Sequence, residues 1–275
     1  MSEPASLDGG LSAAQRAAWE RDGFFICRAL ADETTCRAQW ERAVELARAD
    51  VAGADLLPTY VLREPALDTP DRAGEERASK IFRLHRDEPL FRAFACRPDL
   101  LAILRDLLGP DLDCFLSQFI FKHGGTLGQP WHQDAFYFPF DRGPQVGVWL
   151  AVTEAHEDNS PLWVVPGSHR EPIHDVVPDP REEAPFGYVE IVDHDMDGAV
   201  CVPMQPGDVL IFHSHLMHRS TDHRGGAVRA AMVWHYGDAA TVDQTEARWG
   251  RPSPNNDWMG VLRNGQLASR PAPNY

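Results

Sequence analysis

Residues 207–220 read GDVLIFHSHLMHRS. A Gly-Asp turn leads into the apolar run 209–212, which is typical of a short buried strand. Three histidines, His213, His215 and His218, follow this run. Because imidazole is the commonest side-chain ligand of transition metals, the stretch predicts that one of the three histidines binds a metal.

Further short apolar runs occur along the same part of the chain, and Gly, Pro, Asn and Asp separate them. They occupy residues 115–121, 146–153, 162–165, 188–192 and 228–235. Many short strands between turn residues favour a β-sandwich or a barrel. We therefore predict a mainly β fold, a jelly roll, after Pro110.

The first 110 residues have helical features instead. Residues 12–23 begin with a capping Ser and end with Gly, which predicts a short helix. Residues 24–26 predict a brief strand, residues 32–52 a longer helix, and residues 88–108 further helices interrupted by a proline. We expect these helices to pack outside one sheet of the jelly roll.

The chain has 275 residues, of which 43% are hydrophobic and 24% charged, as in ordinary globular proteins. We expect a single domain over residues 1–275. Its expected parts are a helix-rich N-terminal layer at 1–110, a jelly-roll core at 111–240 and a C-terminal extension at 241–275.

The charge and the apolar runs exclude several classes of protein. The net charge of −15 disfavours binding to nucleic acid, whose phosphates an acidic surface repels. No run approaches 18 apolar residues, so no membrane span is expected, and residues 1–10 lack the apolar core of a signal peptide. We therefore expect a cytoplasmic protein. Five scattered cysteines argue against a disulfide framework and a thiolate zinc site.

A second metal-type motif, Trp131-His132-Gln133-Asp134, precedes the strand at 146–153. On a strand, residues i and i+2 point to the same face, so His132 and Asp134 would both reach one metal. With one of the three later histidines they would complete a set of two His and one carboxylate, which leaves positions open on Fe(II). The motif alone is also compatible with a surface His and a turn Asp.

The chain resembles the phytanoyl-CoA dioxygenase family in three blocks, within roughly residues 75–240. They are WHQDAFYFPF at 131–140, NSPLWVVPGSH at 159–169 and GDVLIFHSHLMHRS at 207–220. The resemblance implies that His132, Asp134 and His218 are the iron ligands.

The resemblance also implies a site for 2-oxoglutarate. The family's Arg for this co-substrate maps onto Arg229, with Ser220 beside it. Trp149, Gln118 and Lys80 map onto further co-substrate positions. A guanidinium matches a carboxylate with two parallel hydrogen bonds, and an Arg within an apolar strand is costly to bury without such a partner. An Arg at a sheet edge, paired with a protein acid, is the alternative.

Several other residues have no assigned chemistry. His213 and His215 would share a face of one strand and are expected to pack or to support the site. His169 is expected to be structural, and His123 and His235 are unassigned. The aromatic residues after the iron motif fit a protein core better than a substrate pocket: Trp131, Phe136, Tyr137, Phe138 and Phe140.

The resemblance implies a double-stranded β-helix, the cupin-like jelly roll, that uses Fe(II), 2-oxoglutarate and O₂, with ascorbate as reductant in vitro. The expected reaction is hydroxylation of an unactivated C–H bond, with release of succinate and CO₂. Desaturation, ring closure and epimerisation use the same chemistry and stay open. Halogenating relatives lack the metal carboxylate, so Asp134 disfavours halogenation.

Two other functions stay open. A cupin-like hydrolase or isomerase on Zn or Mn would use the same ligands but would not need Arg229 and Ser220. A jelly roll that only binds a metabolite would not need the ligand set. We expect a small or medium-sized metabolite as substrate, because a CoA thioester favours a basic rim and the chain has only two lysines. A monomer or homodimer is expected.

Overall fold

A nine-stranded antiparallel sheet, the main sheet, forms the centre of the molecule. The computed structural model describes residues 7, 9–185 and 187–268. The strand order is β1-β10-β5-β12-β4-β13-β14, and β3 pairs with both β4 and β2. The strands are β1 (Phe24–Cys27), β2 (Tyr60–Arg63), β3 (Ala78–Phe82), β4 (Leu112–Lys122), β5 (Val146–Ala151), β10 (Val209–His213), β12 (Arg229–Asp238), β13 (Met259–Arg263) and β14 (Gln266–Leu267).

A smaller antiparallel sheet and a hairpin complete the β structure. The sheet has the order β11-β6-β9, and the hairpin pairs β7 with β8. Their bounds are β6 (Leu162–Val164), β7 (Val176–Pro178), β8 (Val189–Ile191), β9 (Val200–Val202) and β11 (His218–Ser220). Each apolar run that we predicted as a strand after Pro110 overlaps one of the observed strands.

The first helix begins and ends where its capping residues predict, and the second lies within the expected residues 32–52. The Ser12 side chain accepts a hydrogen bond from Gln15 N, and Gly23 ends the helix with a φ of 82°. The Asp32 side chain likewise accepts from Thr35 N at 2.7 Å. The helices are α1 (Ala13–Asp22), α2 (Glu33–Val51), α3 (Leu84–Asp87), α4 (Pro89–Ala95), α5 (Pro98–Leu108) and α6 (Thr245–Trp249). The 3₁₀ turns are η1 (Asp134–Tyr137), η2 (Glu157–Asn159) and η3 (Ser168–Arg170).

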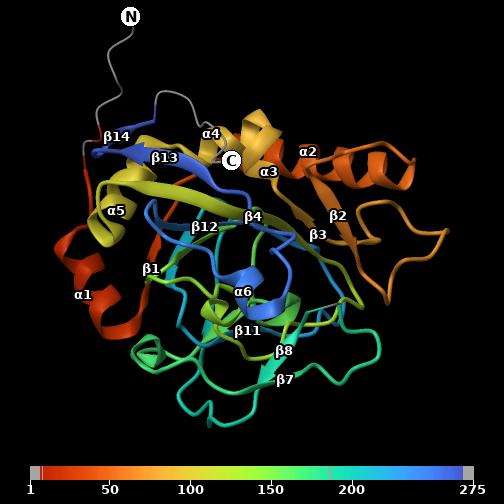
Figure 1. Ribbon diagram of the computed structural model, residues 1–275. Coiled ribbons are helices and arrows are strands. Elements are labelled where there is room, and N and C mark those ends of the chain that lie inside the picture. The colour runs from red at the N-terminus through yellow and green to blue at the C-terminus, as the bar shows by residue number, and fades with distance from the viewer. Residues whose placement is uncertain (1–6, 8, 186, 269–275) are drawn as a thin grey trace, which may run out of the picture.

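The N-terminal helices cover one face of the main sheet, and Figure 1 shows α2, α4 and α5 on the side away from β7 and β8. Between helices and sheet lies the largest apolar core, in which Phe94 stacks on Trp234 at a ring distance of 4.7 Å. Burying one such side chain contributes about 1.5–3 kcal/mol. This core therefore stabilises the helix-covered face of the main sheet. The other face of the sheet is available for a functional site.

Strand β12 shows how the two faces differ. Met232 and Trp234 point into the helix-side core, whereas Arg229, Val233 and His235 line a cavity on the other face. This alternation is the period of two that every strand imposes. Polar residues on an otherwise apolar strand thereby reach one site without disturbing the core.

The main sheet also takes strands from the two ends of the chain. Strands β1, β2 and β3 come from the helix-rich part, and β13 and β14 from the part after residue 240. Residues 1–6 and 8, within the polar N-terminal segment, and residues 269–275, within the C-terminal extension, lie outside the described residues. None of the helices in the described part is long and apolar enough to cross a membrane.

Candidate active site

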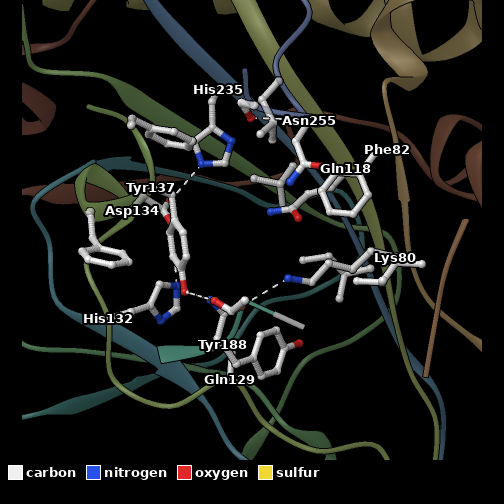
Figure 2. Close-up of a pocket in the computed structure, with 18 of the residues that line it drawn as sticks. Lys80, Phe82, Gln118, Gln129, His132, Asp134, Tyr137, Tyr188, His235 and Asn255 are labelled. Atoms are coloured by element: carbon white, nitrogen blue, oxygen red, sulfur yellow. Dashed lines mark hydrogen bonds and ion pairs between the residues drawn. The ribbon is translucent and has the colours of Figure 1, made fainter. Parts of the chain in front are cut away.

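A cavity of about 590 Å³ opens on the face of the main sheet opposite the helices. Side chains from β3, β4, β5 and β12 line one side, and residues of β8, β11 and the segment 129–138 line the other. Figure 2 shows His132, Asp134 and His235 along one side of this cavity and Lys80 across from them. One end of the cavity therefore carries potential metal ligands, and the other end carries a cationic side chain.

His132, Asp134 and His218 meet at the first end. One ligand atom from each lies within 4.8 Å of those of the other two. Asp134 Oδ1 is 3.6 Å from His132 Nε2 and 3.7 Å from His218 Nε2. The backbones of the two histidines exchange a pair of hydrogen bonds of 3.0 Å, and this isolated bridge sets the two rings side by side.

Backbone carbonyls fix the protonation of both histidine rings. His132 Nδ1 lies 2.8 Å from Pro130 O, and His218 Nδ1 lies 2.9 Å from Leu216 O. A carbonyl only accepts, so each Nδ1 carries a hydrogen, and in the neutral ring Nε2 is the nitrogen with the lone pair. Burial, assisted by His132, lowers the pKa of His218 to about 4, which keeps its ring neutral. The two rings are thus prepared for a metal ion, and the donor set fits Fe(II).

His235 holds the carboxylate of Asp134 from behind. Its Nε2 lies 2.9 Å from Asp134 Oδ2, so Oδ1 remains available to a metal. Burial alone would raise the pKa of Asp134, but the surrounding imidazoles of His218, His132 and His235 outweigh this effect. The pKa of Asp134 therefore lies well below its usual range, and the group is a carboxylate.

The prediction that His132 and Asp134 lie on one strand is wrong. His132 forms only the isolated bridge with His218, and Asp134 begins the 3₁₀ turn η1. The side chain of Gln133 donates to the carbonyls of Pro172 and His215 at 3.0 and 2.9 Å. These bonds hold the segment in a turn, and the turn rather than a pleat brings both ligands to one point.

The two other histidines of the 207–220 stretch lie elsewhere. His213 ends β10 and packs against Trp19 and His169 at ring distances of 5.5 and 5.4 Å. His215 lies in the following turn, with Nδ1 3.1 Å from Glu171 O. They do not share a face of one strand, because β10 ends at His213. Neither lines the cavity.

Three buried cations, Arg229, Lys80 and Lys122, gather at the second end of the cavity. Arg229 Nε donates to Ser160 O at 2.8 Å, Lys80 Nζ donates to Gln129 Oε1 at 3.2 Å, and Lys122 Nζ donates to Leu127 O. Within the described part of the chain, no carboxylate lies within 4.0 Å of any of the three.

Burial makes these charges costly. It lowers the pKa of Arg229 to about 10 and that of Lys80 to about 8, and it lowers that of Lys122 well below its usual value. Glu64 is the nearby acid, and burial raises its pKa. Buried cations without an ion-pair partner are destabilising. This end of the cavity therefore fits an anion that enters with a ligand.

The remaining residues of the expected co-substrate site surround these cations. Trp149, Gln118 and Ser220 line the cavity, and the guanidinium of Arg229 lies 5.7 Å from the Trp149 ring. Of the aromatic cluster after the iron motif, Phe136, Tyr137 and Phe138 line the cavity. The other two members, Trp131 and Phe140, pack in small apolar cores.

The sequence interpretation left out two residues of this site, His235 and Lys122. Both follow from strand alternation. His235 is six positions after Arg229 on β12, and Lys122 is four positions after Gln118 on β4. Even spacings place side chains on one face.

Comparison with known proteins agrees with this geometry. The family model "Phytanoyl-CoA dioxygenase (PhyH)" matches residues 19–231. The chain belongs to the phytanoyl-CoA dioxygenase family. It is 30% identical over 243 residues to the bovine (Bos taurus) "Phytanoyl-CoA dioxygenase, peroxisomal". This alignment covers 83% of this chain and 69% of the bovine protein. The chain is also 30% identical over 173 residues to a zebrafish (Danio rerio) "Phytanoyl-CoA dioxygenase domain-containing protein 1", covering 60% of this chain and 59% of that protein.

Solved structures show the same fold. Apo EctD from S. alaskensis matches with a TM-score of 0.69 and 24% identity over 98% of this chain and 88% of that chain. The epimerase SnoN from nogalamycin biosynthesis matches with a TM-score of 0.63 and 19% identity over 93% of this chain and 94% of that chain. The predicted double-stranded β-helix with N-terminal helices is confirmed. Like its family, the chain is a 2-oxoglutarate-dependent non-haem iron dioxygenase.

The contact between His235 and Asp134 gives a first testable prediction. Replacing His235 by Phe keeps the ring volume but removes the hydrogen bond that orients the carboxylate. Losing such a partner weakens metal binding about tenfold or more. We expect this loss in a competitive Fe(II) titration.

The matched control is His223→Phe. His223 is also buried, and its ring hydrogen-bonds to Ala227 and Gly225 in its own loop. We expect it to keep the wild-type iron affinity. Equal affinities for all three proteins would mean that His235 is only a packing residue.

Proposed function

We propose that this enzyme hydroxylates an unactivated C–H bond of a small or medium-sized metabolite and releases succinate and CO₂. The carrying observation is the cavity with a His-Asp-His set at one end and three buried cations at the other. A dicarboxylate with a 2-oxo group is the ligand that satisfies both ends.

In this proposal His132, Asp134 and His218 hold the iron. Iron bound there supplies the oxidative decarboxylation of 2-oxoglutarate by O₂ and the attack on the C–H bond. The backbone bridge and the fixed Nε2 lone pairs present the ligands without rearrangement. His235 keeps the carboxylate of Asp134 turned toward the metal position.

Arg229 is proposed to bind the 5-carboxylate of 2-oxoglutarate. Its Nε is occupied by Ser160 O, so the terminal NH₂ groups remain for the ligand. Ser220 adds a hydroxyl beside it, and Lys80 adds charge from β3. Trp149 and Gln118 border the chain of the co-substrate. Because Arg229, Ser220 and Lys80 are buried, their contacts are worth more than they would be in water.

The substrate is proposed to enter past an aromatic wall. Tyr60 and Phe82 stack at a ring distance of 5.1 Å, and Phe136 and Trp249 lie 6.3 Å apart. All four line the cavity, whose volume of about 590 Å³ suits one small molecule beside the co-substrate. This supports a compact metabolite rather than a CoA thioester.

Other outcomes of the same chemistry stay within the proposal. Solved relatives of the same fold include an epimerase, SnoN, and a carbocyclase, SnoK. EctD has been solved with 2-oxoglutarate and 5-hydroxyectoine, and with Fe. For this chain we propose hydroxylation as the default, with ring closure, desaturation and epimerisation as alternatives.

We also propose a cytoplasmic monomer or homodimer. Curated relatives from cattle, rat and mouse are described as peroxisomal. Cell fractionation tests the compartment, and light scattering tests the oligomeric state.

Release of succinate tests the proposed function. We expect the protein with Fe(II), ascorbate and 2-oxoglutarate to form succinate slowly even without a substrate, and faster with one. The reason is that both ends of the cavity fit this co-substrate. Succinate is measured by chromatography, with the Asp134→Ala variant as the control.

A different result would favour a different use of the metal. If neither succinate nor binding of 2-oxoglutarate to the iron-loaded protein were detected, a cupin-like enzyme on Zn or Mn would replace the proposal. Such an enzyme would leave the three buried cations without a ligand.

A further inference from the structure

A second cluster of metal-type side chains lies outside the cavity, at the open end of the β7–β8 hairpin. Glu171 and His174 precede β7, and His194 follows β8. One ligand atom from each lies within 4.8 Å of those of the other two. The cluster takes no part in the mechanism proposed above.

The distances suit one small cation. Glu171 Oε2 is 3.1 Å from His174 Nε2 and 3.2 Å from His194 Nε2. Ligands of tetrahedral zinc, each about 2.0–2.1 Å from the ion, lie about 3.3 Å from one another. The two rings are nearly perpendicular, at 74°, so they do not stack and both turn a nitrogen to the same carboxylate.

Asp193 orients one of the rings. Its Oδ1 lies 3.1 Å from His174 Nδ1, and its Oδ2 accepts a hydrogen bond from Asp175 N at 3.2 Å. A His that donates Nδ1–H to a carboxylate presents the lone pair of Nε2, and zinc ligands in proteins have this support. The carboxylates of Glu171 and Asp193 together balance the charge of a divalent ion.

The cluster is linked to the iron motif. His174 N donates to Gln133 Oε1 at 2.9 Å, and Gln133 Nε2 donates to Pro172 O at 3.0 Å. Gln133 stands between the two iron-motif residues His132 and Asp134. An ion that joined Glu171, His174 and His194 would therefore brace the turn that holds those residues.

We propose that Glu171, His174 and His194 form a zinc site that clamps the two ends of the β7–β8 hairpin. Water completes the tetrahedron, and the ion enters from solvent, because 39% of the Glu171 side chain is exposed. The site is separate from the iron centre and does not depend on the proposed reaction.

Zinc binding is best measured where the iron site cannot take the metal. We therefore use the His218→Ala background and dialyse it against Zn²⁺ alone. We expect one more equivalent of bound zinc in His218→Ala than in the double variant His218→Ala/His194→Gln. The measured quantity is the difference in zinc content between the two proteins. Any zinc that still binds at the iron site is the same in both and does not affect this difference.

The matched control is His218→Ala/His156→Gln. His156 is an exposed histidine whose Nδ1 lies 3.8 Å from Asp158, outside the cluster. This control variant should keep the same equivalent of bound zinc as His218→Ala. In the His218→Ala background, Zn²⁺ should also raise the melting temperature, and adding Glu171→Gln or His194→Gln should abolish this rise.

Two results would overturn the proposal. One is equal zinc content in the parent and the His194→Gln variant, including none in either, provided both are folded by circular dichroism. The other is a zinc-dependent rise in the melting temperature of His218→Ala that survives both added substitutions, Glu171→Gln and His194→Gln. The cluster would then be a hydrogen-bonded ion cluster in which His174 is shared by two carboxylates.

Discussion

His218→Ala is expected to purify without iron, whereas His215→Ala keeps about one iron per chain. His218 supplies one of the two imidazole nitrogens at the metal position, and Asp134 and His132 alone make an incomplete set. The backbone bridge to His132 uses no side-chain atom, so the local fold should survive. Iron is measured after anaerobic reconstitution and desalting.

His213→Gln is the second control. It removes the imidazole nearest along the strand, which packs on Trp19 and His169 outside the cavity. We expect it to retain iron. If the His218 variant kept its iron and either control lost it, the third ligand would be misassigned.

The strands of the core were predictable because their signals are local. Strands β4, β5, β10 and β12 are apolar runs between turn residues, and the caps of α1 are short motifs. Strands β2 and β3 were not predicted. Both are short, and their pairing with β4 depends on contacts with a distant part of the chain.

The site was predictable in composition but not in geometry. Family blocks pointed to His132, Asp134 and His218, yet the strand argument for the first two was wrong. The bridge from His132 to His218 and the bonds of Gln133 place these residues, and neither can be read from spacing. The segment that carries His132 and Asp134 is held by tertiary hydrogen bonds and is not the β-strand that the local pattern suggests.

The cationic end shows what only the folded structure adds. The chain has two lysines, and both are buried beside Arg229, although the net charge is −15. Sequence reasoning treated the small number of lysines as evidence about the surface. The structure instead places both lysines where an anionic ligand is needed, which supports a dicarboxylate co-substrate.

Arg229→Leu is expected to keep the fold and the iron but to weaken 2-oxoglutarate binding about ten- to a hundredfold. A hydrogen bond to a charged group is worth about 1.5–3 kcal/mol, and about 1.4 kcal/mol corresponds to a factor of ten. A bidentate contact made by a buried guanidinium extends this range upward. Arg229→Lys keeps the charge without the planar fork, so we expect an intermediate loss.

The decisive comparison uses two co-substrates and one neighbouring cation. A 2-oxo acid without the distal carboxylate should bind the wild type and Arg229→Leu almost equally, because it has no group for the guanidinium. Lys122→Met removes a buried charge from the same end of the cavity and should weaken 2-oxoglutarate less, because an ammonium cannot make the paired contact. Calorimetric titration of both acids into the iron-loaded proteins gives the affinities. Two results would contradict this assignment. One is an equal loss of affinity for both acids in Arg229→Leu. The other is a larger loss of 2-oxoglutarate affinity in Lys122→Met than in Arg229→Leu.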